Sequence, residues 1–169
     1  PLSCMKIVDM LFESGLPEDR CYFCMPENLK LAEKLVSDER IDFFSFIGSA
    51  KIGWMLRSKL SPGTRCALEH GGMAPTFLTE STDLDTASKL LVKGGFYHAG
   101  QVCVSVQRAF IHKSIFNEFL DLFTENLKKF QIGNPLNNKT DIGPLIRPAE
   151  VDRVHTWVSE ALKNVAELI

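Results

Sequence analysis

The stretch IDFFSFIGSAKIGWMLRSKLSPGTRCALEHGG, residues 41–72, contains the pattern that decides the fold. Residues 41–47 form an apolar, aromatic-rich run typical of a buried strand, and Gly48 and Ser49 then open a helical pattern that continues to about residue 60. Residues 64–68 form a second apolar run of strand length. Two strands joined through a helix by short connections predict a parallel sheet with helices on its faces.

The same alternation continues on both sides of this stretch. Upstream, we expect a helix at residues 2–14, a short strand at residues 21–25 and a helix at residues 27–37. Downstream, we expect strands at residues 75–79 and 105–112 and helices from residue 82, at residues 114–130 and at residues 149–162. The βαβαβ order predicts an α/β fold. Gly94 and Gly95 weaken the helix that is expected from residue 82. We also expect a domain boundary near Gly71 and Gly72.

Composition and charge exclude several classes of function. The 169 residues carry a formal net charge of −2, with 45% apolar and 24% charged residues, which is typical of a globular protein with a substantial core. No block of lysine and arginine points to nucleic acid or an anionic membrane surface as a partner, and no apolar run approaches the length of a membrane span. Because the first residue is Pro1, we expect the chain to be an internal piece of a longer protein.

The cysteines indicate a cellular compartment and do not indicate a metal or redox site. Five cysteines are scattered through the chain, and this odd number favours free thiols in a reducing, intracellular setting. Cys21 and Cys24 form a C-x-x-C pair, but neither a second pair nor a nearby histidine completes a zinc site. A redox pair would stand at the start of a helix, whereas this pair lies in an expected strand. We therefore expect no metal in the chain.

Two stretches at the ends of expected strands could bind a ligand, and each also has an ordinary structural explanation. Gly48 and Ser49 lie where a strand runs into a helix, an arrangement that either binds a phosphate or simply caps the helix. Glu69 follows a strand and precedes two glycines, so it is either a general base at a ligand site or a surface carboxylate. These residues alone leave both alternatives open.

A single cysteine stands out in GFYHAGQVCVSVQRAFI, residues 95–111. A lone cysteine is usually a core residue, but the glycine and glutamine before Cys103 allow a tight turn that could present the thiol as a nucleophile. His70 and His98 are candidate bases for such a thiol, although nothing in the sequence places either ring beside it. The residues alone therefore leave Cys103 either buried or reactive.

Taken together, in this order and spacing, these stretches resemble the signatures of the aldehyde dehydrogenase superfamily. FIGSAKIG resembles its F-T-G-S-x-x-x-G cofactor signature, LEHGGMAP its L-E-L-G-G-K-x-P signature and FYHAGQVC its F-x-x-x-G-Q-x-C signature. Glu69 precedes Cys103 by 34 residues, as in this family. GNPLNNKTDIGPLI resembles the downstream G-D-P-x-x-x-x-T-x-x-G-P-x-I segment. The resemblance covers essentially the whole chain.

The resemblance implies a role for each matching residue. Cys103 would be the catalytic nucleophile and Glu69 the general base in the oxidation of an aldehyde to a carboxylic acid with NAD or NADP. The aldehyde would form a thiohemiacetal and then a thioester on Cys103, which water activated by Glu69 would hydrolyse. The implied cofactor-binding residues are Gly48, Ser49, Gly53, His70 and Gly71. Ile47, His70 and Met73 stand where threonine, leucine and lysine are usual, and none of these departures removes a reacting group.

The resemblance also implies a domain organisation. Residues 1–70 would be the second half of a Rossmann-like cofactor-binding domain, and residues 71–169 the N-terminal part of an α/β catalytic domain. Because family members are much longer, we expect the isolated chain to be inactive or nearly so, and the full-length protein to be a cytoplasmic homo-oligomer. The alternative is a non-enzymatic binding or structural protein that has kept the scaffold, and Cys103 reactivity distinguishes the two.

Overall fold

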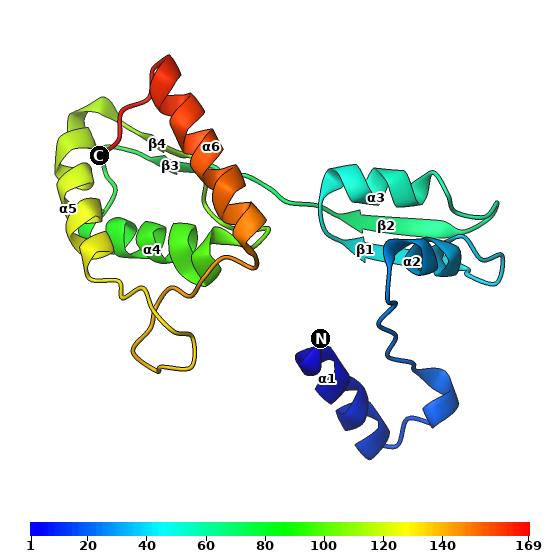
Figure 1. Ribbon diagram of the computed structural model, residues 1–169. Helices are drawn as coiled ribbons and strands as arrows, with labels where there is room; N and C mark the ends of the chain where they lie inside the picture. The colour runs from blue at the N-terminus through cyan, green and yellow to red at the C-terminus, as the bar shows by residue number, and fades with distance from the viewer. The chain divides into compact units, whose positions relative to one another are not determined.

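The computed structural model describes residues 1–169 and divides into two compact units, Pro1–His70 and Gly71–Ile169 (Figure 1). The first unit contains α1 (Leu2–Glu13), a 3-10 turn (Glu18–Arg20), α2 (Leu29–Val36), β1 (Phe43–Ile47), α3 (Ala50–Arg57) and β2 (Arg65–Glu69). The second contains β3 (Thr76–Leu78), α4 (Leu84–Phe96), a 3-10 turn (Tyr97–Gly100), β4 (Ala109–Ile111), a 3-10 turn (Lys113–Ile115), α5 (Phe116–Lys128) and α6 (Pro148–Asn164). The assignment of the units to a cofactor-binding and a catalytic domain stays a prediction.

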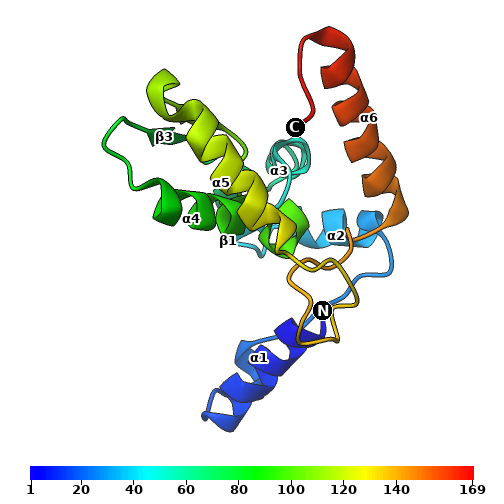
Figure 2. The same cartoon turned by 90° about the vertical axis from the view of Figure 1, so that its left-hand side faces the viewer.

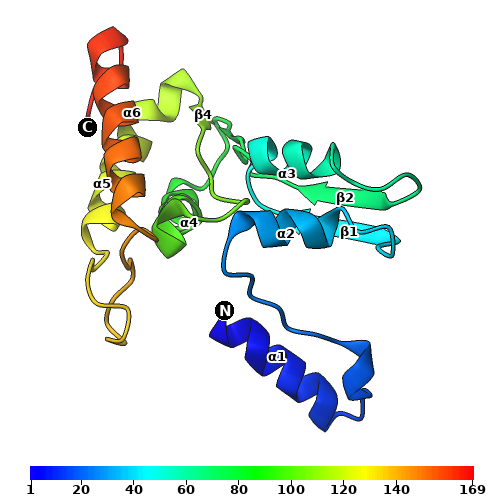
Figure 3. The same ribbon diagram turned by 45° about the vertical axis from the view of Figure 1, so that its right-hand side comes forward.

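In the first unit, β1 and β2 form a parallel pair with α3 as the crossover between them. The register runs from Phe43 opposite Arg65 to Ile47 opposite Glu69. Leu56 of α3 is buried, and α3 lies along one face of the strand pair in Figure 3. This is the parallel βαβ arrangement that the pattern of residues 41–72 predicts, and it confirms the α/β class.

The second unit has a small closed core between α4, α5 and the parallel pair β3–β4. Leu78, Leu91 and Phe119 are its buried members, and they come from a strand and from both helices. The buried Ser88 hydroxyl also accepts a hydrogen bond from Asn126 Nδ2 at 2.9 Å, which links α4 to α5. Figure 2 shows α5 lying alongside α4.

Three strand expectations differ from the structure. The strand expected at residues 105–112 is shorter, because only Ala109–Ile111 pair with β3. The strand expected at residues 21–25 does not form, although the backbone of Cys21 is extended (φ −146°, ψ 132°). A strand needs a hydrogen-bonded neighbour, and β1 pairs only with β2 in this sheet. The strand expected to be buried, β1, has one exposed face, with Phe43 54% and Ile47 80% exposed. Its other face, which carries Phe46, is half-buried because α3 covers that face.

Helix α4 also differs from expectation at both ends. It begins at Leu84 and not at residue 82, because Asp83 is the N-cap and its carboxylate accepts from the Thr86 N–H at 3.3 Å. The helix continues through Gly94 and Gly95 to Phe96. Glycine lowers the stability of a helix, but at these two positions it allows Val106 to lie directly against the helix. No helix of the structure combines the length and apolarity needed to cross a membrane.

Candidate functional site

The carboxyl ends of β1 and β2 lie at one edge of the first unit's sheet. Ile47 lies opposite Glu69 in the register, and the Gly48 N–H donates to the Glu69 carbonyl at 3.0 Å. The backbone pairing therefore continues one residue beyond β1. The strand register alone thus brings the Gly48–Ser49 turn next to Glu69 and His70, at the edge where open parallel sheets place their ligands.

Ser49 starts α3 at this edge. Its side-chain oxygen accepts from the Ile52 N–H at 3.4 Å and caps the helix, and Ser49 remains exposed. The first N–H groups of a helix have no partner inside it, so the start of α3 presents hydrogen-bond donors and a partial positive charge. This arrangement can bind an anion such as a phosphate group.

The two glycines near this edge are required by close packing of rings. A Cβ on Gly48 would lie 2.6 Å from Phe46 Cζ, and a Cβ on Gly53 would lie 2.5 Å from His70 Cε1. The His70 ring also packs near Trp54, with 6.2 Å between ring centroids. Both ring nitrogens of His70 are buried without a hydrogen-bond partner, so this side chain has unused hydrogen-bonding capacity beside α3.

The residues named by the three signatures divide between the two units. Five of them, Gly48, Ser49, Gly53, Glu69 and His70, lie together in the first unit. Gly71 and Cys103 lie in the second unit. Glu69 is the last residue of β2 and is exposed, and Gly71 is also exposed, with no atom within 4 Å of the position of an added Cβ.

Cys103 lies on a turn and not in the core. The Ser105 N–H donates to the Val102 carbonyl at 3.1 Å, which closes a turn with Cys103 at its first central position. Cys103 is exposed, and its backbone N–H makes no hydrogen bond within the chain. The turn therefore presents both a thiol and a free N–H donor, which removes the core interpretation of this residue.

Three consecutive residues with left-handed backbone precede this turn. The φ values are 52° at His98, 56° at Ala99 and 72° at Gly100. Glycine adopts this conformation freely, whereas each non-glycine residue costs about 1–2 kcal/mol. Strain of this kind is kept where the surrounding contacts enforce it, and it is enriched at functional sites.

Gln101 connects the Cys103 turn to the downstream loop. Its Nε2 donates to the carbonyls of His98 at 3.0 Å and Pro144 at 3.4 Å, and its Oε1 accepts from the Ile146 N–H at 2.8 Å. A groove of about 1090 Å³ lies beside these contacts and is lined by His98, Gln101 and residues of the 135–146 loop. The glutamine of the third signature thus joins it physically to the fourth.

Two further supports of the turn are not apparent in the sequence. A Cβ on Gly72 would lie 3.1 Å from the Cys103 carbonyl oxygen, so the second glycine of LEHGG leaves room for the Cys103 turn. Ser105 is 2% exposed and contacts the end of α4. The one signal for Ser105 is a serine within the apolar run VCVSV.

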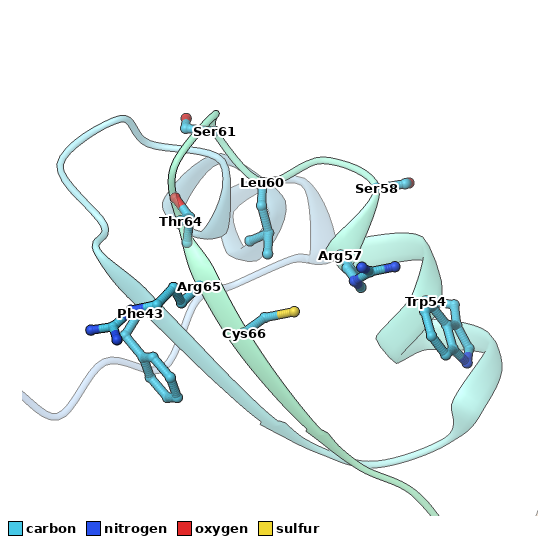
Figure 4. A pocket seen from close by; sticks show the side chains of 9 residues that line it. All are labelled: Phe43, Trp54, Arg57, Ser58, Leu60, Ser61, Thr64, Arg65 and Cys66. Carbon is cyan, nitrogen blue, oxygen red and sulfur yellow. The ribbon is translucent and has the colours of Figure 1, made fainter.

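A second cavity has none of the predicted residues in its lining. It measures about 780 Å³ and is lined by residues at the end of α3 and the start of β2, among them Trp54, Arg57 and Cys66 (Figure 4). In Figure 4 the Cys66 sulfur points toward Arg57. Because Cys66 lies near the start of β2 and Glu69 at its end, this cavity is at the opposite end of the strand from the signature residues. The five cysteines are all free, and no group of three or more His, Cys, Asp or Glu side chains is placed to hold a metal.

Comparison with known proteins decides the family. The model of the family described as "Aldehyde dehydrogenase family" matches residues 1–169. The chain belongs to the aldehyde dehydrogenase family. It is similar to 3-sulfolactaldehyde dehydrogenase of Priestia aryabhattai, at 34% identity over 168 residues that cover 99% of this chain and 35% of that protein. It is also similar to lactaldehyde dehydrogenase of Methanocaldococcus jannaschii, at 35% identity over 82% of this chain and 30% of that protein.

Solved structures of aldehyde dehydrogenases share the fold. An NAD-dependent aldehyde dehydrogenase from Sinorhizobium meliloti matches with a TM-score of 0.93 and 27% identity over 99% of this chain and 33% of that one. An NADP-dependent glyceraldehyde-3-phosphate dehydrogenase from Bacillus halodurans C-125, complexed with NADP, matches with a TM-score of 0.88 and 26% identity over 97% of this chain and 34% of that one. The chain spans about a third of the length of the relatives it matches.

Proposed function

We propose that this chain is part of an NAD- or NADP-dependent aldehyde dehydrogenase that oxidises an aldehyde to a carboxylic acid through a thioester on Cys103. The single observation that carries the proposal is the exposed Cys103 thiol on a turn that follows three left-handed residues. Family membership supports it, and the names of the solved relatives include both NAD and NADP. The alternative of a non-enzymatic scaffold predicts an ordinary surface thiol at Cys103.

The first unit supplies residues that fit a dinucleotide. The free N–H groups at the start of α3, with Gly48 and exposed Ser49, suit a pyrophosphate. Gly53 lets the His70 ring approach α3 and pack near Trp54, and exposed Gly71 follows it in the chain, so we assign these residues to the cofactor side of the site. The nicotinamide supplies the hydride acceptor, which the protein has only to position.

In the second unit, the thiolate of Cys103 attacks the aldehyde carbon and forms a thiohemiacetal. The free N–H of Cys103 is the donor available to the developing oxyanion. When the thiohemiacetal collapses, its carbon loses hydride and becomes the carbonyl of a thioester. The Glu69 carboxylate then takes a proton from water, and the hydroxide attacks the thioester, so that the carboxylic acid is released and the thiol is restored.

Compartment and assembly follow the same proposal. All five cysteines are free, which supports a reducing compartment, and we place the protein in the cytoplasm. Exposed apolar residues such as Ile47 and Phe77 support burial of these faces against further protein in a homo-oligomer of the full-length enzyme. Neither nucleic acid nor a membrane is a proposed partner.

An activated ester tests the nucleophile without any cofactor. Thiol acylation by p-nitrophenyl acetate should give a burst of p-nitrophenolate, with the acetyl group found on Cys103 by peptide mapping. Cys103→Ala should remove the burst. Glu69→Gln should keep the burst and slow the following hydrolysis by about 10²-fold or more, the usual contribution of a general base.

The exposed Cys24 gives the matched control for this experiment. Cys24→Ala should leave both the burst and the hydrolysis unchanged. Acetyl groups spread evenly over Cys4, Cys24 and Cys103, with no burst, would instead support the non-enzymatic scaffold. Separately, assays of NADH or NADPH production from several aldehydes test the expectation that the 169-residue chain does not turn over alone.

A further inference from the structure

Ser105 is one of two serines that the second unit buries almost completely. It is 2% exposed, and Ser88 is 0% exposed. Burial of a hydroxyl is unfavourable unless the group is hydrogen-bonded. Ser105 Oγ donates to the Gly95 carbonyl at 3.1 Å, so the hydroxyl that lies two residues after Cys103 is satisfied by the last turn of α4.

The same segment satisfies a second carbonyl of that turn. The last carbonyls of a helix have no partner inside it. The Val106 N–H donates to the Gly94 carbonyl at 3.1 Å, next to the Ser105–Gly95 hydrogen bond. Residues Ser105 and Val106 therefore cap the C-terminal end of α4 from outside the helix. Since Ser105 also closes the Cys103 turn through its N–H, the cap and the turn share one residue.

Glycine is required for this approach. A Cβ on Gly94 would lie 3.3 Å from Val106 Cγ2, and a Cβ on Gly95 would lie 3.3 Å from the Val106 carbonyl oxygen. Both distances are tighter than ordinary contact. The two glycines that lower the helical propensity of α4 therefore let the chain beyond Cys103 lie directly against the helix.

We propose that Ser105 is a positioning residue for Cys103, because its buried hydroxyl fixes the nucleophile turn to the C-terminal end of α4. This inference rests on the proposed function, since it assigns Ser105 a role in presenting the nucleophile of that reaction. The hydroxyl acts through the turn and does not touch the substrate. Gln101 also holds this loop, but its contacts are exposed, so Ser105 is the buried anchor of the two.

The test is the rate of alkylation of Cys103 by iodoacetamide, followed by peptide mapping in the folded chain and in the chain unfolded by urea. Wild type should show a folded rate and pH profile distinct from those of the unfolded chain. Ser105→Ala should lose about tenfold in the folded rate, since misplacement of a reacting group by an ångström costs up to about 10²-fold. Its pH profile should move toward that of the unfolded chain.

Ser88→Ala is the matched control. The Ser88 hydroxyl also donates to a backbone carbonyl, that of Asp85 at 3.0 Å, and it accepts from Asn126. The S88A variant should therefore lose at least as much thermal stability as S105A while its Cys103 rate and pH profile stay unchanged. Hydrogen exchange at the Val106 amide, measured on S105A, should accelerate because the turn has left α4.

The outcomes separate this inference from the proposed function. If wild-type Cys103 reacts equally in the folded and unfolded chains, the proposed function fails first. If wild type is distinct but S105A keeps its rate and pH profile, or keeps Val106 protection, the positioning role is wrong. A rate that falls equally in S88A and S105A, or an S105A variant that no longer folds, would make Ser105 a residue of general stability and would also overturn the inference.

Discussion

The edge of the β1–β2 sheet and the Cys103 turn carry the candidate chemistry of the two units, and they are built in different ways. At the sheet edge, regular structure does the positioning. The strand register places Ile47 opposite Glu69, and Ser49 lies at the point where α3 must begin. At the Cys103 turn, the chain has no regular structure, and its position depends on side chains and close contacts far along the sequence.

Because the sheet edge and the Cys103 turn are built differently, mutations should have different effects at each. The sheet edge is sensitive to volume, because Gly48 and Gly53 are packed against rings. The Cys103 turn is sensitive to backbone conformation and to hydrogen bonds, because left-handed residues and the Gln101 amide hold it. Variants of the first kind should change the stability of one unit, whereas variants of the second kind should mainly change the local order of a loop.

The largest effect is expected for Gly53→Ala. Its Cβ would lie 2.5 Å from His70 Cε1 and 3.0 Å from Phe46 Cδ1, so two rings must move. We expect a loss of about 2 kcal/mol in the free energy of unfolding, the usual scale of overpacking, even after the gain in helix propensity. Urea unfolding followed by Trp54 fluorescence in a Trp157→Phe background measures it. Gly71→Ala, which meets no atom within 4 Å, should change stability little, and equal losses in both variants would contradict the volume argument.

Much of the sheet edge could be predicted from sequence because its signals are local. The apolar run before Gly48, the Ser49 cap and the run before Glu69 are each visible within a few residues. Irregular structure depends on contacts that no short window contains. Cys21 has extended backbone, but whether it joins a strand depends on a partner elsewhere in the chain. Gly94 and Gly95 weaken a helix by propensity alone, and only the approach of Val106 explains why the helix continues through them.

Some residues of the candidate site can be recognised from the sequence, and others only from the structure. Cys103 and Glu69 stand out through their signatures, although their roles stay predictions. Ser105 does not stand out, because a buried serine and an exposed serine look alike in a sequence until the Gly95 carbonyl is known to lie 3.1 Å away. Asp83 is the cap of α4 because its carboxylate accepts from both the N–H and the hydroxyl of Thr86.

A smaller effect is expected for Gly100→Ala, which tests the backbone of the Cys103 turn. Gly100 has a φ of 72°, and an added Cβ would lie 3.4 Å from the Gly95 carbonyl oxygen. We expect a loss of about 1 kcal/mol, because a left-handed residue other than glycine costs about 1–2 kcal/mol and the glycine entropy offsets part of it. Thermal unfolding of the second unit measures it. Ala99→Gly, at a φ of 56°, should have the opposite sign, and a destabilising Ala99→Gly would contradict the strain argument.

Gln101→Glu tests the link between the turn and the downstream loop with less effect on global stability. The substitution replaces the Nε2 donor with an oxygen that faces the carbonyls of His98 and Pro144. Both donated hydrogen bonds are lost and the oxygens repel one another, so the loop should open. We expect about tenfold faster hydrogen exchange at the Ile146 amide, the equivalent of one hydrogen bond of about 1.4 kcal/mol. Asn137→Asp in the same loop serves as the control, because Asn137 Oδ1 accepts from the Lys139 N–H and makes no hydrogen bond with Gln101. Unchanged Ile146 exchange in Gln101→Glu would show that the amide does not hold the loop.

The smallest effect is a pH dependence at the start of α4, for which the caps of the first unit provide the contrast. Hydrogen bonds from the Thr86 side chain and backbone hold the pKa of the Asp83 carboxyl below its usual value. A carboxyl whose pKa is lower in the folded state contributes stability above its unfolded pKa and loses it as pH falls through the folded pKa. The Asn28 and Ser49 side chains that cap α2 and α3 do not titrate. Asp83→Asn should therefore lower the thermal unfolding temperature near neutral pH by a few degrees at most, and the difference from wild type should shrink as the pH falls below about 4. A difference that stays constant from neutral pH to acid would show that the Asp83 charge contributes nothing to the cap.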